Sequence, residues 1–109
     1  MQQHSDYYLI LEDEKAVGGV RVVRREGGKC RISPLFVVPE RQGRGVAKAA
    51  MRQVEALYPG VMWELNTILQ ETKNCRLYER LGYTRTGEYE EINERMTLVY
   101  YRKHPVGRR

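Results

Sequence analysis

The sequence is poor in the residues and patterns that define several large classes of protein. Its 109 residues include two cysteines, Cys30 and Cys75, and two histidines, and none of these is spaced as metal ligands or redox pairs are. No apolar run approaches the roughly 18 residues of a membrane-spanning helix, and the N-terminus lacks the apolar core of a signal peptide. We therefore expect a cytoplasmic protein with reduced thiols, no metal site and no membrane contact.

The composition fits one folded domain. Hydrophobic residues make up 41% of the chain and charged residues 30%, a balance typical of globular rather than disordered proteins. We expect a single domain over residues 1–109, with 1–5 and 104–109 frayed. The formal net charge of +5 suits either an anionic ligand or nucleic acid, so charge alone does not choose between them.

The N-terminal third has the two-residue periodicity of β-strands. Apolar and polar residues alternate in part over 7–11, 16–25 and 29–38, and Gly27-Gly28 is typical of a hairpin turn. Three antiparallel strands in meander order are the simplest arrangement of these segments.

The period then changes to that of a helix, which Pro59-Gly60 ends. The apolar residues at helical spacing are Val46, Ala47, Ala50, Met51, Val54, Leu57 and Tyr58, with Arg52 and Glu55 expected on the other face. Further elements are predicted at 61–66 (strand), 72–81 (helix), and 84–90 and 95–103 (strands of a hairpin through Ile92-Asn93-Glu94). The order β-β-β-α-β-α-β-β predicts a mixed α/β (α+β) sheet in which antiparallel strands surround one central parallel pair.

The most informative segment joins the third strand to the first helix. The apolar run 35–38 stops at Pro39, and a short loop with Gly43 and Gly45 opens directly into the helix. Glycines let a backbone approach a ligand closely, and a helix N-terminus gathers free N–H groups and partial positive charge. Three side chains add further charge: Arg41, Arg44 and Lys48. This segment predicts a site for phosphate.

Two motifs give the chain a family resemblance. The segment Gln42-Gly43-Arg44-Gly45-Val46-Ala47 matches the pattern Q-x-x-G-x-[GA] of the GNAT acyltransferase superfamily, in which that loop binds the pyrophosphate of acetyl-coenzyme A. Downstream, Leu77-Tyr78-Glu79-Arg80-Leu81-Gly82-Tyr83 resembles the family segment L-Y-E-[KR]-L-G-[FY]. One helix and one strand separate the two motifs, as in the family, and the resemblance covers residues 7–103.

The resemblance implies an N-acetyltransferase that moves an acetyl group from acetyl-CoA directly to a primary amine. The acceptor would be a small molecule or a peptide, with no role for nucleic acid. Tyr78 would be the general acid that protonates the leaving thiolate. The implied cofactor-binding residues are Phe36, Val37 and Val38 for the pantetheine arm, Gln42, Gly43, Arg44, Gly45, Val46 and Ala47 for the pyrophosphate, and Asn74.

The chain also departs from the family pattern. It begins near the second family strand, without the first strand and helix pair that normally wall part of the acceptor site, so a homodimer that completes the wall is one expectation. The asparagine often found seven residues before the motif tyrosine is Glu71 here, and Asn74 is its suggested replacement. The general base stays open between Glu64, Glu71 and water.

Four other functions could use the same glycine loop or charged surface. A dinucleotide fold would use Gly43, Gly45 and an acid such as Glu64, but Lys48 stands where its third glycine belongs. A Walker loop fails because Val46 follows Gly45. A catalytically silent acyl-CoA sensor or a basic nucleic-acid-binding module would use the same charged surface, although most aromatic residues fall at alternating strand positions rather than in a base-stacking patch.

Overall fold

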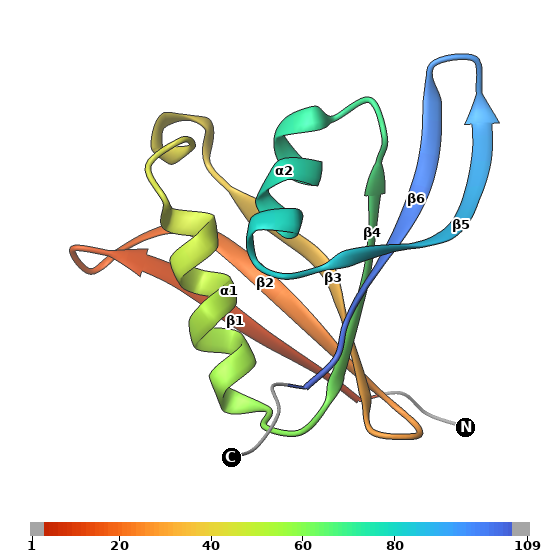
Figure 1. The fold of residues 1–109 in the computed structure, drawn as a ribbon. Coiled ribbons are helices and arrows are strands. Elements are labelled where there is room, and N and C mark those ends of the chain that lie inside the picture. The colour runs from red at the N-terminus through yellow and green to blue at the C-terminus, as the bar shows by residue number, and fades with distance from the viewer. Residues whose placement is uncertain (1–3, 106–109) are drawn as a thin grey trace.

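The computed structural model describes residues 4–105, apart from the side chain of Pro34. It contains the expected succession of strands and helices, with one added turn of 3-10 helix, η1 (Pro39–Arg41) (Figure 1). The elements are β1 (His4–Glu12), β2 (Lys15–Arg25), β3 (Lys29–Val37), α1 (Val46–Leu57), β4 (Met62–Ile68), α2 (Thr72–Arg80), β5 (Thr84–Asn93) and β6 (Met96–Lys103).

One six-stranded mixed sheet holds the domain together, in the order β1-β2-β3-β4-β6-β5. Its neighbours are antiparallel except β3 and β4, which are parallel and are joined through α1. The predicted fold class, with one central parallel pair, is therefore confirmed. The crossover matters for function because it places the start of α1 beside the end of β3.

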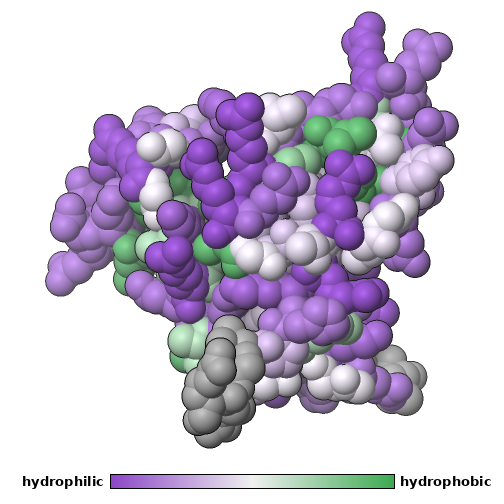
Figure 2. All heavy atoms as spheres, in the orientation of Figure 1, coloured by the Kyte–Doolittle hydropathy of each residue, from purple (hydrophilic) through white to green (hydrophobic). Residues whose placement is uncertain are grey.

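Both helices pack on the same face of the sheet, which we call the helix face. Met51 of α1 and Tyr78 of α2 share one buried cluster with Val22, Leu65 and Tyr101 of three different strands. Figure 1 shows the two helices side by side in front of the strands, and Figure 2 shows that their outer surface is mostly hydrophilic. The opposite side, which we call the open face, carries no helix among residues 4–105.

Some boundaries differ from expectation. Strand β1 starts at His4, which pairs with Arg24, although residues 1–5 were expected to fray; 1–3 and 106–109 lie outside the described residues. The last hairpin turns at Glu94 and Arg95 rather than through 92–94. The reason is local, because the Asn93 side-chain oxygen accepts a 2.8 Å hydrogen bond from the Arg95 amide and so closes the turn itself.

Two side chains of α1 do not lie where helical spacing predicted. Leu57 is 58% exposed, since the last turn of α1 extends past the core. Glu55 is turned toward the protein, where it accepts 2.8 Å hydrogen bonds from the Tyr83 hydroxyl and from Lys103 Nζ. Periodicity alone assigns a glutamate to solvent, and only the position of β6 supplies the cation that draws it inward.

Within residues 4–105, no helix has both the length and the apolar character needed to cross a bilayer. Cys30 and Cys75 are both buried and unpaired, as expected of structural thiols.

Candidate functional site

The parallel strands β3 and β4 are paired only at their N-terminal ends and then separate. They pair over three positions only, ending at Arg31 beside Glu64. Beyond that point β3 continues to Val37 and β4 to Ile68, each bonded on its outer side to β2 or β6 but not to the other. The sheet is therefore open along its centre, with two backbone edges facing each other.

The open edge of β3 presents the amide of Val37. The next residue, Val38, donates its N–H to the Val17 carbonyl at 2.8 Å. Since backbone polar groups alternate in direction along a strand, the N–H and C=O of Val37 point away from β2 and toward the opening. Pairing with β4 ended at Arg31, so this N–H has no strand partner. A buried strand rarely leaves such a donor unmatched without a ligand or water to accept from it.

The glycine loop is tied to the same point. Gln42 Nε2 donates a 2.8 Å hydrogen bond to the Val37 carbonyl, which fixes the loop against the end of β3. Gly43 and Gly45 have φ values of 80° and 82°, a left-handed conformation that other residues adopt at a cost. A Cβ on either glycine would meet nothing within 4 Å. The loop therefore needs glycine for its backbone angles, and the space above it is free.

Helix α1 begins immediately after this loop. The amide of Ala49 is the first to bond within the helix, to the Gly45 carbonyl at 3.0 Å. The amides of 46–48 precede that bond, so they have no acceptor in the helix and carry its positive dipole end. Arg44 is exposed beside them, whereas Arg41 is held by Glu12 at 3.3 Å. This geometry suits a phosphate-bearing group, with Arg44 a better contact than Arg41.

Tyr78 lies on α2 and packs against the helix face of the sheet. The residue is 7% exposed, and its ring lies 6.0 Å from that of Tyr83 and 6.2 Å from that of Tyr101. Burial, with a smaller contribution from Cys75, raises the pKa of the Tyr78 hydroxyl, so the phenol is neutral at pH 7. No side-chain hydrogen bond contributes to this shift, so the phenol is not engaged by another side chain of residues 4–105.

The other predicted site residues fall in separate places. Asn74 is exposed on α2, and Glu71 is exposed at the start of the same helix. Glu64 lies on the open face, where its carboxylate contacts Arg25 at 3.5 Å and Lys29 at 3.9 Å. Of the two carboxylates considered as a general base, Glu64 is thus already paired with cations.

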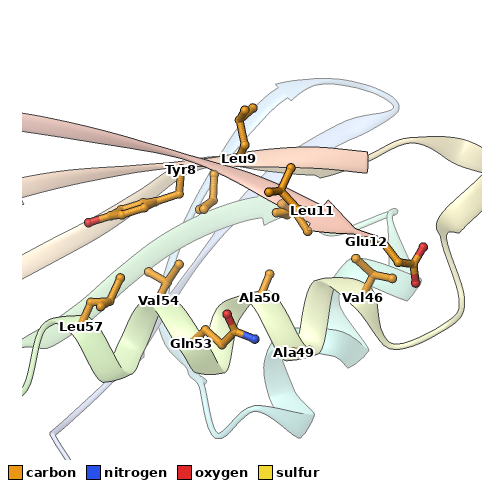
Figure 3. Close-up of a pocket in the computed structure, with 12 residues that line it drawn as sticks. Tyr8, Leu9, Leu11, Glu12, Val46, Ala49, Ala50, Gln53, Val54 and Leu57 are labelled. Carbon is orange, nitrogen blue, oxygen red and sulfur yellow. The ribbon is translucent and has the colours of Figure 1, made fainter. Parts of the chain in front are cut away.

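A cavity of about 270 Å³ lies outside this arrangement, between β1 and α1. Figure 3 shows Tyr8 turned toward α1, with Val54 and Leu57 facing it, while Leu9 points to the other side of the strand. Its walls are mostly apolar, and Tyr78 is not among the residues that line it. We regard this groove as incompletely filled packing at the edge of the sheet.

Sequence reasoning missed a second cavity, of about 240 Å³, on the open face. Its lining residues are Arg21, Val23, Arg25, Arg31 and Ser33. The available signal was Arg21 and Arg25 at positions of β2 that share one face, with Arg31 on the neighbouring strand, a pattern that by itself also describes an ordinary solvated face.

No group of three or more histidine, cysteine, aspartate or glutamate residues within the described part of the chain is arranged to hold a metal ion.

The chain resembles known proteins along most of its length. Residues 1–83 match the model of the acetyltransferase (GNAT) family. A mouse protein named probable N-acetyltransferase family 8 member 5 is 34% identical over 84 residues, which is 71% of this chain and 36% of that protein. The uncharacterized protein YrkN of Bacillus subtilis is 34% identical over 73 residues, 65% of this chain and 40% of that one. The chain thus spans well under half the length of these curated relatives.

Solved structures agree on the fold. The ribosomal-protein-S18-alanine N-acetyltransferase of Escherichia coli superposes with a TM-score of 0.79 at 14% identity, covering 95% of this chain and 71% of that one. A GNAT family acetyltransferase from Elizabethkingia anophelis, solved with acetyl-CoA bound, gives 0.76 at 14% identity, covering 92% and 76%.

Proposed function

Since this chain belongs to the GNAT acetyltransferase family, we propose that it transfers an acetyl group from acetyl-CoA to a primary amine. The observation that carries the proposal is the unmatched Val37 amide, which faces the opening between β3 and β4 and lies beside the glycine loop. A thioester-bearing arm with amide groups can add itself to such an edge as a further strand would.

The ligand would be held at two points. Its diphosphate would accept hydrogen bonds from the loop and from the first amides of α1, with Arg44 adding charge. Its pantetheine arm would run along Phe36, Val37 and Val38 toward the closed end of the opening. Gln42 contributes by positioning, because its bond to the Val37 carbonyl holds loop and strand in register.

Chemistry would take place as direct attack on the thioester. The amine nitrogen bonds to the acetyl carbon, the carbonyl oxygen becomes an oxyanion that a backbone N–H such as that of Val37 stabilises, and the C–S bond then breaks. Tyr78 would give its proton to the leaving thiolate. A thiol has a pKa of about 8.5, so protonating it from a buried phenol is unfavourable at equilibrium and needs close positioning.

The acceptor would attack in its neutral form, which is the minor form at pH 7. An α-amino group, with a pKa of about 7.8, is about one tenth neutral at pH 7, whereas a lysine-type amine is neutral in roughly one molecule in 2500. Because Glu64 already pairs with two cations, we propose that water rather than Glu64 removes the proton from the amine.

Two measurements test the proposal. Titration calorimetry with coenzyme A should give saturable heat, and a panel of amines with acetyl-CoA should release free thiol at a rate that depends on the amine. Absence of heat would contradict the binding site. Saturable binding without thiol release for any amine would contradict the enzyme and favour a silent acyl-CoA sensor.

A further inference from the structure

The open face of the sheet carries a group of cations with almost no matching anions. Arg21, Arg25 and Arg31 line the 240 Å³ cavity together with Ser33 and Val23. The carboxylate of Glu64 contacts Arg25 and Lys29 but is not paired with Arg21 or Arg31. Positive charge therefore gathers around a hollow that has room for several non-hydrogen atoms.

Two of these arginines have a buried nitrogen without an acceptor. The Nε atoms of Arg21 and Arg31 are buried and have no hydrogen-bond partner among the residues that the structure describes. Arg21 is fixed in place, because its Nη2 donates to the Ser5 hydroxyl at 3.0 Å and its guanidinium lies 5.6 Å from the centre of the Tyr7 ring. A buried N–H without an acceptor is costly, so these groups favour an oxyanion that would supply one.

The cavity and the proposed transfer point lie along the same strand, β3. Arg31 is the last residue of β3 paired with β4, and Ser33 follows it at the start of the opening. A bulge in β3 sets Ser33 and Pro34 together opposite Arg21, an irregularity that re-aims side chains near functional sites. From Ser33 to Val37 is four residues, or roughly 13 Å of strand. The Phe36 ring, 57% exposed, covers Gly19 in between and offers an apolar surface.

We propose that this arginine cavity binds the anionic end of the acceptor, so that the acceptor is an amine that also carries a carboxylate or phosphate. The inference rests on the proposed function, because it places the amine of the same molecule at the opening between β3 and β4. The anion would accept hydrogen bonds from Arg21, Arg31 and the Ser33 hydroxyl, and the carbon chain would lie along Phe36.

Matched amines test the substrate class. Thiol release from acetyl-CoA is measured with 6-aminohexanoate, 6-aminohexyl phosphate and the neutral 6-amino-1-hexanol. We expect KM for at least one zwitterion to be about 10-fold or more below that for the alcohol, as one lost charge-assisted hydrogen bond would give. The two anionic probes distinguish a carboxylate site from a phosphate site. Equal KM values for all three amines would overturn the proposal.

Variants then locate the effect. Arg31→Gln should raise KM for the preferred zwitterion about 10-fold. The KM values for that zwitterion and for the alcohol should then be nearly equal. Arg21→Gln serves as the second variant, with thermal unfolding confirming that each protein is folded. Arg52→Gln removes the same charge from an exposed position on α1 and should keep the preference. A preference that survives both cavity variants would overturn the proposal.

Direct binding separates this inference from the function on which it rests. Titration of the protein with 6-aminohexanoate and 6-aminohexyl phosphate should give heat that Arg31→Gln abolishes. Such binding without thiol release would support the anion site and contradict the acetyltransferase. Thiol release from all three amines with equal KM would support the acetyltransferase and contradict the site. Binding of a single-stranded oligonucleotide but of neither zwitterion would also contradict it.

Discussion

Replacing Tyr78 by phenylalanine separates chemistry from folding, because the hydroxyl that would do the chemistry does little for stability. The ring packs against Tyr83 and Tyr101, and phenylalanine keeps those contacts. Its hydroxyl has no side-chain hydrogen bond within residues 4–105 that the substitution would remove. We therefore expect the free energy of unfolding to change by no more than about 0.5 kcal/mol.

Activity should respond very differently. General acid catalysis contributes roughly 10²–10⁴-fold to rate. Burial raises the pKa of Tyr78 above its usual 10, whereas the thiol that receives the proton has a pKa of about 8.5, so the transfer is uphill and we expect the low end of that range. A fall in kcat of about 100-fold follows, equivalent to about 2.7 kcal/mol of barrier. The affinity for coenzyme A should stay within a factor of two or so of wild type.

The assay is steady-state thiol release with acetyl-CoA held above its KM, beside calorimetric titration with coenzyme A. Tyr58→Phe is the matched control for losing a tyrosine hydroxyl. It removes a 2.5 Å hydrogen bond to Asp6 and one of 2.7 Å to Tyr8, so it should cost about 2 kcal/mol of stability and leave kcat unchanged. An unchanged kcat in Tyr78→Phe would refute the role of Tyr78. If Tyr78→Phe lost as much stability as Tyr58→Phe, the claim that the Tyr78 hydroxyl contributes little to stability would be refuted.

Three further predictions follow from the same geometry. Gly45→Ala forces alanine to a φ of 82°, so it should lower the free energy of unfolding by about 1 kcal/mol and weaken coenzyme A binding in calorimetry; unaltered affinity would count against the loop as the diphosphate site. Glu55→Gln removes the charge that pairs with Lys103 but keeps an oxygen that can accept from Tyr83. It should lower the free energy of unfolding in urea by about 2 kcal/mol, and no change would contradict a structural ion pair. Burial raises the pKa of several tyrosines, namely Tyr58, Tyr78, Tyr83 and Tyr101. Above pH 10 the unfolded chain ionises its tyrosines while the folded chain keeps those protons, so stability should be flat up to about pH 10 and fall beyond it; stability that rises there would contradict the sign.

Much of the fold could be predicted because its signals are local. Alternation along the strands, the change to helical spacing at Val46, and the glycines of the loop each depend on residues close together in the chain. The same holds for the two motifs that identify the family, which carry the loop and Tyr78. Errors in the bounds of elements were small, as at Asn93, where one side-chain hydrogen bond decides which residues turn the chain.

Features that depend on contacts between residues far apart in the sequence were decided only by the tertiary structure. Sequence predicts that β3 and β4 are parallel, but the end of their pairing at Arg31 and Glu64 depends on how β2 and β6 hold each strand on its outer side. The inward turn of Glu55 needs Lys103, 48 residues away. The arginine cavity needs the register of two strands and a bulge between them. Periodicity assigns each arginine a face of the sheet, and only the assembled sheet brings their charges to one hollow, where Glu64 contacts Arg25 alone of the three lining arginines.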